Sequence, residues 1–389
     1  MTKLEQLIEE LCPNGVEYLK IGEVVNYEQP SKYIVNSTDY NDDFDVPVLT
    51  AGQTFVLGYT NEKSGIYNAS KEAPVIIFDD FTGAFKWVDF PFKVKSSAMK
   101  ILTVNDRKTY IRYIFHVMGH IGYSSTEHKR LWIGLYSEFE IPVPPLPVQS
   151  EIVRILDNFT ELTAELTAEL TARKQQYAHY RDTLLKLDNN VPSYTLKDIC
   201  LSIADGDHMP PPKADSGVPF ITISNITETR QIDFSNVMYV PREYYDKLAD
   251  KRKAKRDDIL YTVVGSFGIP VHISSKTEFV FQRHIAILRP NQQMIVPRYM
   301  YHIMQSTEFY KQADKAAKGA AQRTIGLSSL GNMTIPLPSI EEQKRIVAIL
   351  DRFDTLCNDI SEGLPAEIEA RQKQYEYYRD KLLTFEPAK

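Results

Sequence analysis

The residues of this chain that could coordinate a metal or cleave a phosphodiester lie in three short segments. Asp205, Asp207 and His208 belong to an Asp-Gly-Asp-His segment whose carboxylates and imidazole are possible metal ligands. The acid-x-Lys triplets 106–108 and 342–344 resemble the end of a common nuclease pattern. A turn explains the first segment more simply, because Asp and Gly favour tight turns and no second ligand cluster accompanies it. The sequence therefore predicts no metal site and no catalytic residue.

The chain also lacks the motifs of nucleotide-dependent and zinc-dependent enzymes. It contains no Gly-x-x-x-x-Gly-Lys-Ser/Thr, Gly-x-Gly-x-x-Gly, His-Glu-x-x-His or Asn-Pro-Pro-Tyr-type methyltransferase motif. Its three cysteines, Cys12, Cys200 and Cys357, are too scattered for a disulfide framework or a cysteine zinc site. Because we find no signal-peptide pattern and no apolar run of about 18 residues, we expect a cytoplasmic protein that does not enter a membrane.

A larger group of side chains has the chemistry needed to read DNA. Gln pairs with adenine and Arg with guanine through two hydrogen bonds, and lysine binds phosphates. The candidates, most of them in predicted loops, are Lys32, Tyr33, Gln53, Thr54, Tyr59, Lys86, Trp87, Lys129, Arg130, His208, Lys213, Lys253, Gln282, Arg283, His284, Gln322 and Arg323. Each is weak evidence alone, and the cationic run 251–256 is equally well explained as a solvated helix face.

The charge distribution neither requires nor excludes a nucleic-acid partner. The whole chain carries a net charge of −6. Residues 14–140 contain 13 basic and 16 acidic side chains, whereas residues 191–334 contain 18 basic and 14 acidic ones. Only the second of these regions is net basic, as a phosphate-binding surface would require.

One segment of the chain occurs twice. Residues 141–159 and 335–353 are identical at ten of 19 positions, where unrelated sequences would share roughly one. A second matched pair, residues 173–185 and 371–383, ends each copy. Each copy begins with prolines, which favour an extended lead-in, and continues with apolar residues at helical spacing. The chain therefore contains an internal duplication.

The apolar spacing predicts two unusually long helices. The first, Val148 to Leu187, would be about 60 Å long, beyond an ordinary globular helix. We expect the two helices to pack on each other as a coiled coil; the alternative is that each belongs to the core of its own domain. Gly363-Leu364-Pro365 predicts a break or kink in the second helix. The expected packing residues are Ile152, Leu156, Phe159, Leu166, Leu170, Tyr177, Ile346, Leu350, Phe353 and Tyr375.

The length of 389 residues suggests two or three domains. We predict an α+β chain with a pseudo-two-fold duplication, in which two mixed α/β domains are joined by two long helices that form a coiled coil. In each domain short β-rich runs precede one helix, yet the loops differ strongly, which indicates one scaffold with two loop sets. The expected segments are a helix in 1–13, a first domain in 14–140, a long helix in 141–189, a second domain in 190–334 and a second long helix in 335–389.

Together these features resemble the specificity subunit of type I restriction–modification enzymes. The resemblance rests on the proline–Gln–Ile lead-in, the helix ending Tyr-x-x-Tyr-Arg-Asp and the two different mixed domains, and it covers essentially all 389 residues. Segments 205–213 and 281–288 are similar to that family's target-recognition domains. Two tandem Thr-Ala-Glu-Leu tetrads, 163–166 and 167–170, are similar to its IC subclass.

The resemblance implies a non-catalytic subunit in which each domain reads one half of a split site in double-stranded DNA through the major groove. It implies that the long helices pack antiparallel, set the spacer and dock two methylation subunits, which restriction and translocation subunits then join. No cofactor is expected on this chain; S-adenosylmethionine and ATP with Mg²⁺ are expected on the partners. The alternatives are a coiled-coil scaffold that binds only proteins and an enzyme acting alone.

Overall fold

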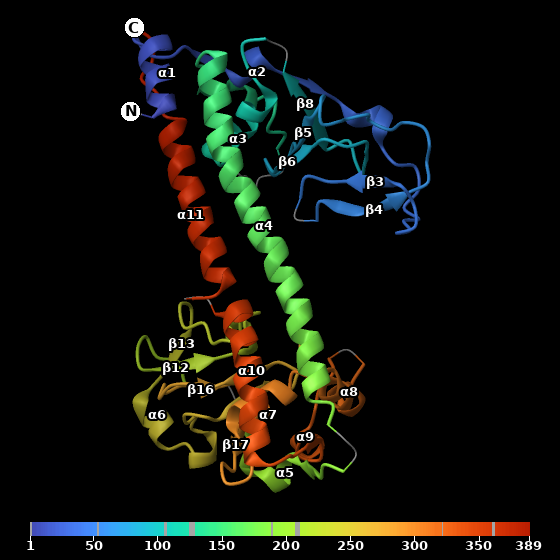
Figure 1. The fold of residues 1–389 in the computed structure, drawn as a ribbon, viewed down its shortest axis with the longest axis vertical. Coiled ribbons are helices and arrows are strands. Elements are labelled where there is room, and N and C mark those ends of the chain that lie inside the picture. Colours follow the sequence, from blue (N-terminus) through green and yellow to red (C-terminus); the bar gives the residue numbers. More distant parts are fainter. Residues whose placement is uncertain are drawn as a thin grey trace. The chain divides into compact units, whose positions relative to one another are not determined.

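The computed structural model describes residues 2–52, 54–104, 107–123, 129–187, 190–206, 211–320, 322–359 and 362–389. The chain divides into two compact units (Figure 1). Unit 1 comprises Met1–Ala164 and Ala370–Lys389, and unit 2 comprises Glu165–Glu369. Each unit thus contains one globular domain together with parts of both long helical regions.

Unit 1 contains two main sheets and a two-stranded ribbon. Its strands are β1 (Tyr18–Lys20), β2 (Val25–Glu28), β3 (Val46–Leu49), β4 (Val56–Thr60), β5 (Val75–Asp79), β6 (Phe85–Val88), β7 (Lys93–Val94), β8 (Met99–Val104) and β9 (Glu140–Pro142). Its helices are α1 (Lys3–Leu11), α2 (Ile21–Val24), η1 (Pro30–Tyr33), α3 (Ile111–Ile121) and η2 (Tyr136–Glu138), with the first part of α4 (Leu146–Leu184) and most of α11 (Leu364–Leu382). The sheet orders are β2-β8-β5-β6 and β4-β3-β7, and only the β3–β7 pair is parallel.

Unit 2 repeats this plan. Its strands are β10 (Ser193–Thr195), β11 (Cys200–Asp205), β12 (Val218–Ile221), β13 (Met238–Val240), β14 (Ile259–Thr262), β15 (Pro270–His272), β16 (Val280–Phe281), β17 (Ile285–Pro290) and β18 (Thr334–Pro336). Its helices are α5 (Leu196–Ile199), η3 (Ile223–Asn225), α6 (Arg242–Asp246), η4 (Asp250–Arg252), α7 (Pro297–Ile303), α8 (Thr307–Ala316), α9 (Leu327–Gly331) and α10 (Ile340–Asn358), with the last part of α4 and the start of α11. The orders β11-β17-β14-β15 and β13-β12-β16, again with one parallel pair, match unit 1 strand for strand and confirm the duplication.

The proline lead-ins begin extended, as expected, but their first residues also pair as strands, which the sequence interpretation did not predict. β9 pairs antiparallel with β1, and β18 pairs antiparallel with β10. In each case proline is the last residue of the strand, Pro142 in β9 and Pro336 in β18. A terminal position suits proline because it has no N–H to contribute to a continuing ladder.

The long helices agree closely with prediction. α4 has 39 residues, begins two residues before the expected Val148, and accommodates Pro147 in its first turn. The second long region is broken as expected, because α10 ends at Asn358 and α11 begins at Leu364, with Pro365 in its first turn. None of the helices in the described parts of the chain is long and apolar enough to cross a membrane.

The predicted apolar residues of the long helices pack in both of the ways that the sequence left open: in the core of a globular domain and against the other long helix. Ile152 and Leu156 are fully buried in the core of unit 1 with its globular domain. Ile346 and Leu350 occupy the same place in unit 2.

Aromatic rings make the contacts between the helices within each unit. In unit 1 the ring of Phe159 on α4 stacks on Tyr378 of α11, 5.2 Å between centroids. In unit 2 the ring of Phe353 on α10 stacks on Tyr180 of α4 at 5.4 Å. Leu170 is half-buried against the core of unit 2, and Leu166 is half-buried on the same helix.

Candidate DNA interface and its helix anchors

Three loops at one edge of unit 2 bring several predicted DNA-binding residues together. The Val263 N–H donates to the carbonyl of His284 at 2.8 Å, and the Gly265 N–H donates to the carbonyl of Arg323 at 3.0 Å. The loop following β14 is therefore held between the 282–284 loop and the 322–324 loop. The predicted residues that this edge collects are Gln282, Arg283, His284, Gln322 and Arg323.

The end of β11 joins the same edge at Gly206. A Cβ atom at Gly206 would lie 1.9 Å from the carbonyl oxygen of Phe281, so only glycine permits this close approach beside Gln282. Gly206 of the Asp-Gly-Asp-His segment therefore lies next to the loop that carries Arg283. Asp207 and His208 themselves lie outside the described residues.

The side chains at this edge differ in how many hydrogen bonds and ion pairs they make within the protein. Arg283 is exposed and makes no hydrogen bond or ion pair with any residue that the structure describes. Arg323 pairs with Asp314 at 2.7 Å and lies over the ring of Phe267. Burial, together with the charge of Arg283, lowers the pKa of His284, so its imidazole is neutral at pH 7. The edge thus offers a free guanidinium beside a neutral imidazole, groups that can bond base edges.

The cationic run of unit 2 is largely paired within the protein. Arg252 lies 3.5 Å from Asp205, and Lys255 lies 2.8 Å from Asp250. The Lys253 ammonium donates to the backbone carbonyl of Asp246 at 2.9 Å. The run is not a helix face, because only Lys251 and Arg252 lie in η4. The predicted Lys213 is exposed.

In unit 1, two of the predicted aromatic residues have contacts within the domain. The Tyr33 hydroxyl donates to Glu28 at 3.1 Å. The Trp87 ring lies under the guanidinium of Arg112, 4.6 Å from the ring centroid. The remaining candidates lie on several elements: Lys32 and Thr54 are exposed, Tyr59 on β4 and Lys86 on β6 are half-exposed, Lys129 and Arg130 are exposed before Trp132, and Gln53 is outside the described residues.

No group of three or more His, Cys, Asp or Glu side chains within the described residues is arranged to hold a metal ion. Glu342 of the second acid-x-Lys triplet lies in the first turn of α10 and pairs with Arg345 at 2.6 Å. Asp106 of the first triplet is outside the described residues.

The helix at the end of each domain is tied to a long helix by an Arg–His–Asp cluster. In unit 1, Arg112 and His116 of α3 each lie 2.8 Å from the Asp157 carboxylate of α4. The His116 ring also bonds the hydroxyl of Tyr375 on α11, at 3.1 Å. One aspartate and one tyrosine therefore connect the domain to two different helices.

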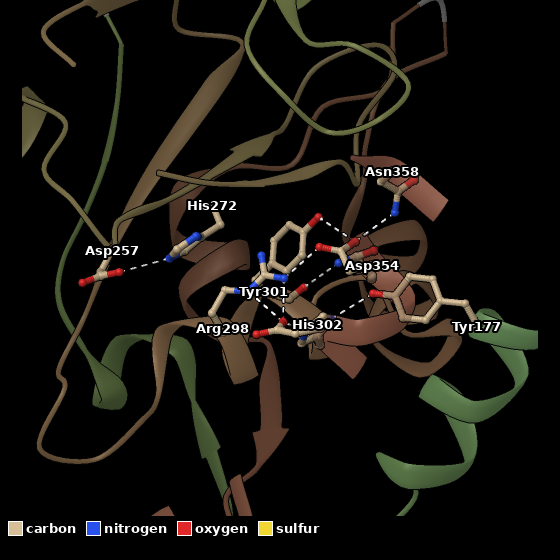
Figure 2. A network of polar contacts seen from close by, with 10 residues as sticks. Tyr177, Asp257, His272, Arg298, Tyr301, His302, Asp354 and Asn358 are labelled. Atoms are coloured by element: carbon tan, nitrogen blue, oxygen red, sulfur yellow. Dashed lines mark hydrogen bonds and ion pairs between the residues drawn. The ribbon is translucent and has the colours of Figure 1, made fainter. Parts of the chain in front are cut away.

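Unit 2 contains the same cluster, shown in Figure 2. Arg298 and His302 of α7 each bond the Asp351 carboxylate of α10 at 2.6 Å. The Tyr177 hydroxyl of α4 bonds the remaining ring nitrogen of His302 at 2.9 Å. Arg298 also pairs with Asp354 at 2.8 Å, a contact that unit 1 replaces by stacking on Trp87.

Burial decides the protonation of both clusters. It lowers the pKa of His116 and of His302, outweighing the opposite effect of the neighbouring carboxylates. Burial alone would raise the pKa of Asp351, but hydrogen bonds from His302 and Arg298 hold it below its ordinary value. A neutral imidazole next to a carboxylate must donate its Nε2–H to that carboxylate, so its Nδ1 accepts from the tyrosine O–H.

A second anchor comes from the glutamine of each lead-in. Gln149 is fully buried, and its side-chain oxygen accepts from the Tyr110 N–H at 3.1 Å, at the start of α3. Its amide donates to the carbonyls of Lys108 and Pro144 at 2.7 and 2.8 Å. Gln343 is also fully buried and likewise bonds the Val296 N–H at the start of α7, at 2.8 Å.

The sequence interpretation did not predict the polar contacts of these anchors. Tyr177 and Tyr375 were predicted as apolar packing residues, but each also uses its hydroxyl to bond a histidine of a globular domain. The available signal was that the same polar residues recur in both copies of the duplication.

The pH dependence of stability should reveal the two buried histidines. Their native pKa values are lowered from about 6.5, so below that pH the unfolded chain binds protons that the native chain does not. We expect the urea midpoint to be constant above pH 7 and to fall between about pH 6.5 and 5. His116→Gln and His302→Gln should flatten this fall, whereas His179→Gln, at an exposed position on α4, should not. Equal slopes in all variants would contradict the assignment.

Two mixed domains with different loops, each hydrogen-bonded to two long helices, define a two-site recognition architecture. A family model described as the type I restriction modification DNA specificity domain matches residues 13–173 and 189–370. The chain belongs to this family and is a DNA specificity subunit of a type I restriction–modification system.

Individual relatives agree with this assignment. The chain is 44% identical to the EcoR124I/EcoR124II specificity subunit of Escherichia coli, over 99% of this chain and 97% of that protein. It is 31% identical to a putative type I specificity subunit of Haemophilus influenzae, over 99% and 98% of the two chains. Its fold is similar to the crystal structure of a type I S subunit from M. genitalium, with a TM-score of 0.57, 14% identity and coverage of 95% and 96%.

Proposed function

We propose that this chain is the non-catalytic subunit that reads a split target in double-stranded DNA, with residues 14–140 reading one half and residues 190–334 the other. The observation that carries the proposal is one scaffold, repeated strand for strand, that presents two different sets of loops. A shared scaffold with divergent loops is what two independent half-sites require.

The edge of unit 2 formed by Gln282–His284 and Gln322–Arg323 is the proposed contact surface of the second domain. Its unpaired guanidinium at Arg283 and the amide at Gln282 suit bidentate contacts with guanine and adenine in the major groove. In unit 1 the proposed contacts come from the exposed or half-exposed side chains of Lys32, Thr54, Tyr59 and Lys86.

Partner subunits carry out methylation, restriction and translocation. The long helices dock two methylation subunits, and restriction and translocation subunits join that core. S-adenosylmethionine would supply the methyl group on the methylation subunits, and ATP with Mg²⁺ would act on the translocation subunits. This chain then contributes the positions of the two half-sites and the spacer between them.

Exchange of one domain tests the proposal. Replacing residues 14–140 by the equivalent domain of a relative should change one half-site completely and leave the other half unchanged, because the second domain keeps all its loops. The measurement is sequencing of modified bases in host DNA, with the reciprocal exchange of residues 190–334 as the matched control. A change in both halves, or in neither, would show that the domains are not independent readers. Absence of any footprint on DNA by the assembled complex would favour a protein-binding scaffold.

A further inference from the structure

The first tyrosine of each Tyr-x-x-Tyr-Arg-Asp motif, Tyr177 or Tyr375, bonds the globular domain of the other copy of the duplication. In the sequence, Tyr177 ends the copy that begins with the first domain, and Tyr375 ends the copy that begins with the second. In the structure, Tyr375 bonds His116 of the first domain and Tyr177 bonds His302 of the second. Each domain is therefore completed by a tyrosine from the opposite copy.

The hydrogen bond from each tyrosine has a specific effect on the domain that it reaches. His116 and His302 are fully buried, so the Nδ1 atom of each ring has no water to bond if the tyrosine hydroxyl is removed. The same ring donates through Nε2 to the aspartate of the other long helix, Asp157 or Asp351. The imidazole thus fixes the domain helix against two long helices at once, and the tyrosine completes that three-way connection.

The two tyrosines can affect DNA reading only indirectly, because they lie between the globular domains and the long helices. α3 and α7, which carry these histidines, are the helices of the globular domains against which the long helices pack. Tyr177 is 4% exposed, and Tyr375 is partly buried against the core of unit 1, so neither ring is placed to stack on a base. Any influence of these hydroxyls on recognition must therefore act through the orientation of the domain.

We propose that Tyr375 and Tyr177 are positioning residues, each of which orients the recognition domain of the opposite copy: Tyr375 the domain at 14–140, and Tyr177 the domain at 190–334. This inference rests on the proposed function, since it assumes that each domain reads one half-site. Loss of one hydroxyl loosens one domain, so base discrimination falls in one half of the target and is retained in the other.

The experiment compares Tyr375→Phe and Tyr177→Phe in the full chain, expressed with its methylation and restriction subunits. The readout is the ratio of methylation at cognate sites to methylation at sites with one wrong base, determined separately for each half by sequencing modified bases in host DNA. Phenylalanine keeps the ring and removes one buried hydrogen bond, so we expect about a tenfold lower ratio in one half only. Tyr375→Phe should affect the half read by residues 14–140, and Tyr177→Phe the other.

Tyr377→Phe is the matched control, because Tyr377 lies on the same helix as Tyr375 and its side chain is 62% exposed. It should leave both ratios unchanged. Hydrogen exchange of the purified complex should show faster exchange in α3 for Tyr375→Phe and in α7 for Tyr177→Phe. Equal losses in both halves, or exchange changes in the wrong domain, would overturn the inference, as would unchanged ratios. A wild-type chain that directs no bipartite methylation would instead refute the proposed function itself.

Discussion

Gln149→Leu is expected to destabilise unit 1 by about 2–6 kcal/mol, because it removes four hydrogen bonds of a fully buried side chain at once. The glutamine side chain satisfies the Tyr110 N–H, the Thr109 hydroxyl and the carbonyls of Lys108 and Pro144, at distances of 2.7–3.2 Å. Leucine has a similar volume but offers no hydrogen bond, so water must enter or the start of α3 must separate from α4. Urea unfolding, monitored by hydrogen exchange in α3, measures the loss.

Two further glutamine variants serve as comparisons for Gln149→Leu. Gln343→Leu should have a similar effect confined to unit 2, since Gln343 accepts from the Val296 N–H at the start of α7 and donates to the carbonyls of Met294 and Pro338, at 2.8–3.2 Å. Gln175→Leu, at an exposed position of α4, should change stability by no more than about 0.5 kcal/mol. A loss below about 1 kcal/mol for Gln149→Leu would mean that the lead-in glutamine does not hold domain and helix together.

The sequence was informative about the architecture because duplication and periodicity are local signals. The repeat predicted two equivalent halves, and helical spacing located α4 to within three residues at each end. Gly363 and Pro365 predicted the break between α10 and α11 from their backbone preferences alone. The ribbon strands β9 and β18 were missed, because a Pro-rich segment gives no strand pattern and its partner strand lies more than a hundred residues earlier.

The anchors could not be predicted in the same way, since each depends on partners that are distant in sequence. Helical spacing placed Tyr375 on an apolar stripe, but it gave no information that its hydroxyl meets His116, 259 residues earlier. For the same reason, the sequence offered Trp87 as a DNA-binding candidate but did not reveal that the Arg112 guanidinium lies over its ring. The collection of Arg283 and Arg323 at one edge also follows from strand order, which a single sequence does not reveal.

Deleting one tetrad, Thr167–Leu170, is expected to shorten the preferred spacer between the half-sites by one base pair, or at most two. The division between units 1 and 2 falls after Ala164, inside the tandem tetrads. The deletion alters no strand, loop or anchor residue of either domain, and removes only the contact of Leu170 with the core of unit 2. Four helical residues contribute about 6 Å of rise and turn the following helix by about 40°. Base pairs are about 3.4 Å apart, and a helix lying obliquely to the DNA transmits only part of its length change.

Methylation of DNA substrates that differ only in spacer length measures this effect. Both half-sites should keep their sequences, because no loop of either domain is altered. Thr171→Ala is the length-preserving control: it removes the hydroxyl that donates to the Thr167 carbonyl at 3.0 Å, but keeps the register of the helix. It should therefore retain the wild-type spacer. An active deletion variant with the wild-type spacer preference would show that α4 does not measure the distance between half-sites, since a helix that sets this distance cannot lose a full turn without moving the domains that it carries.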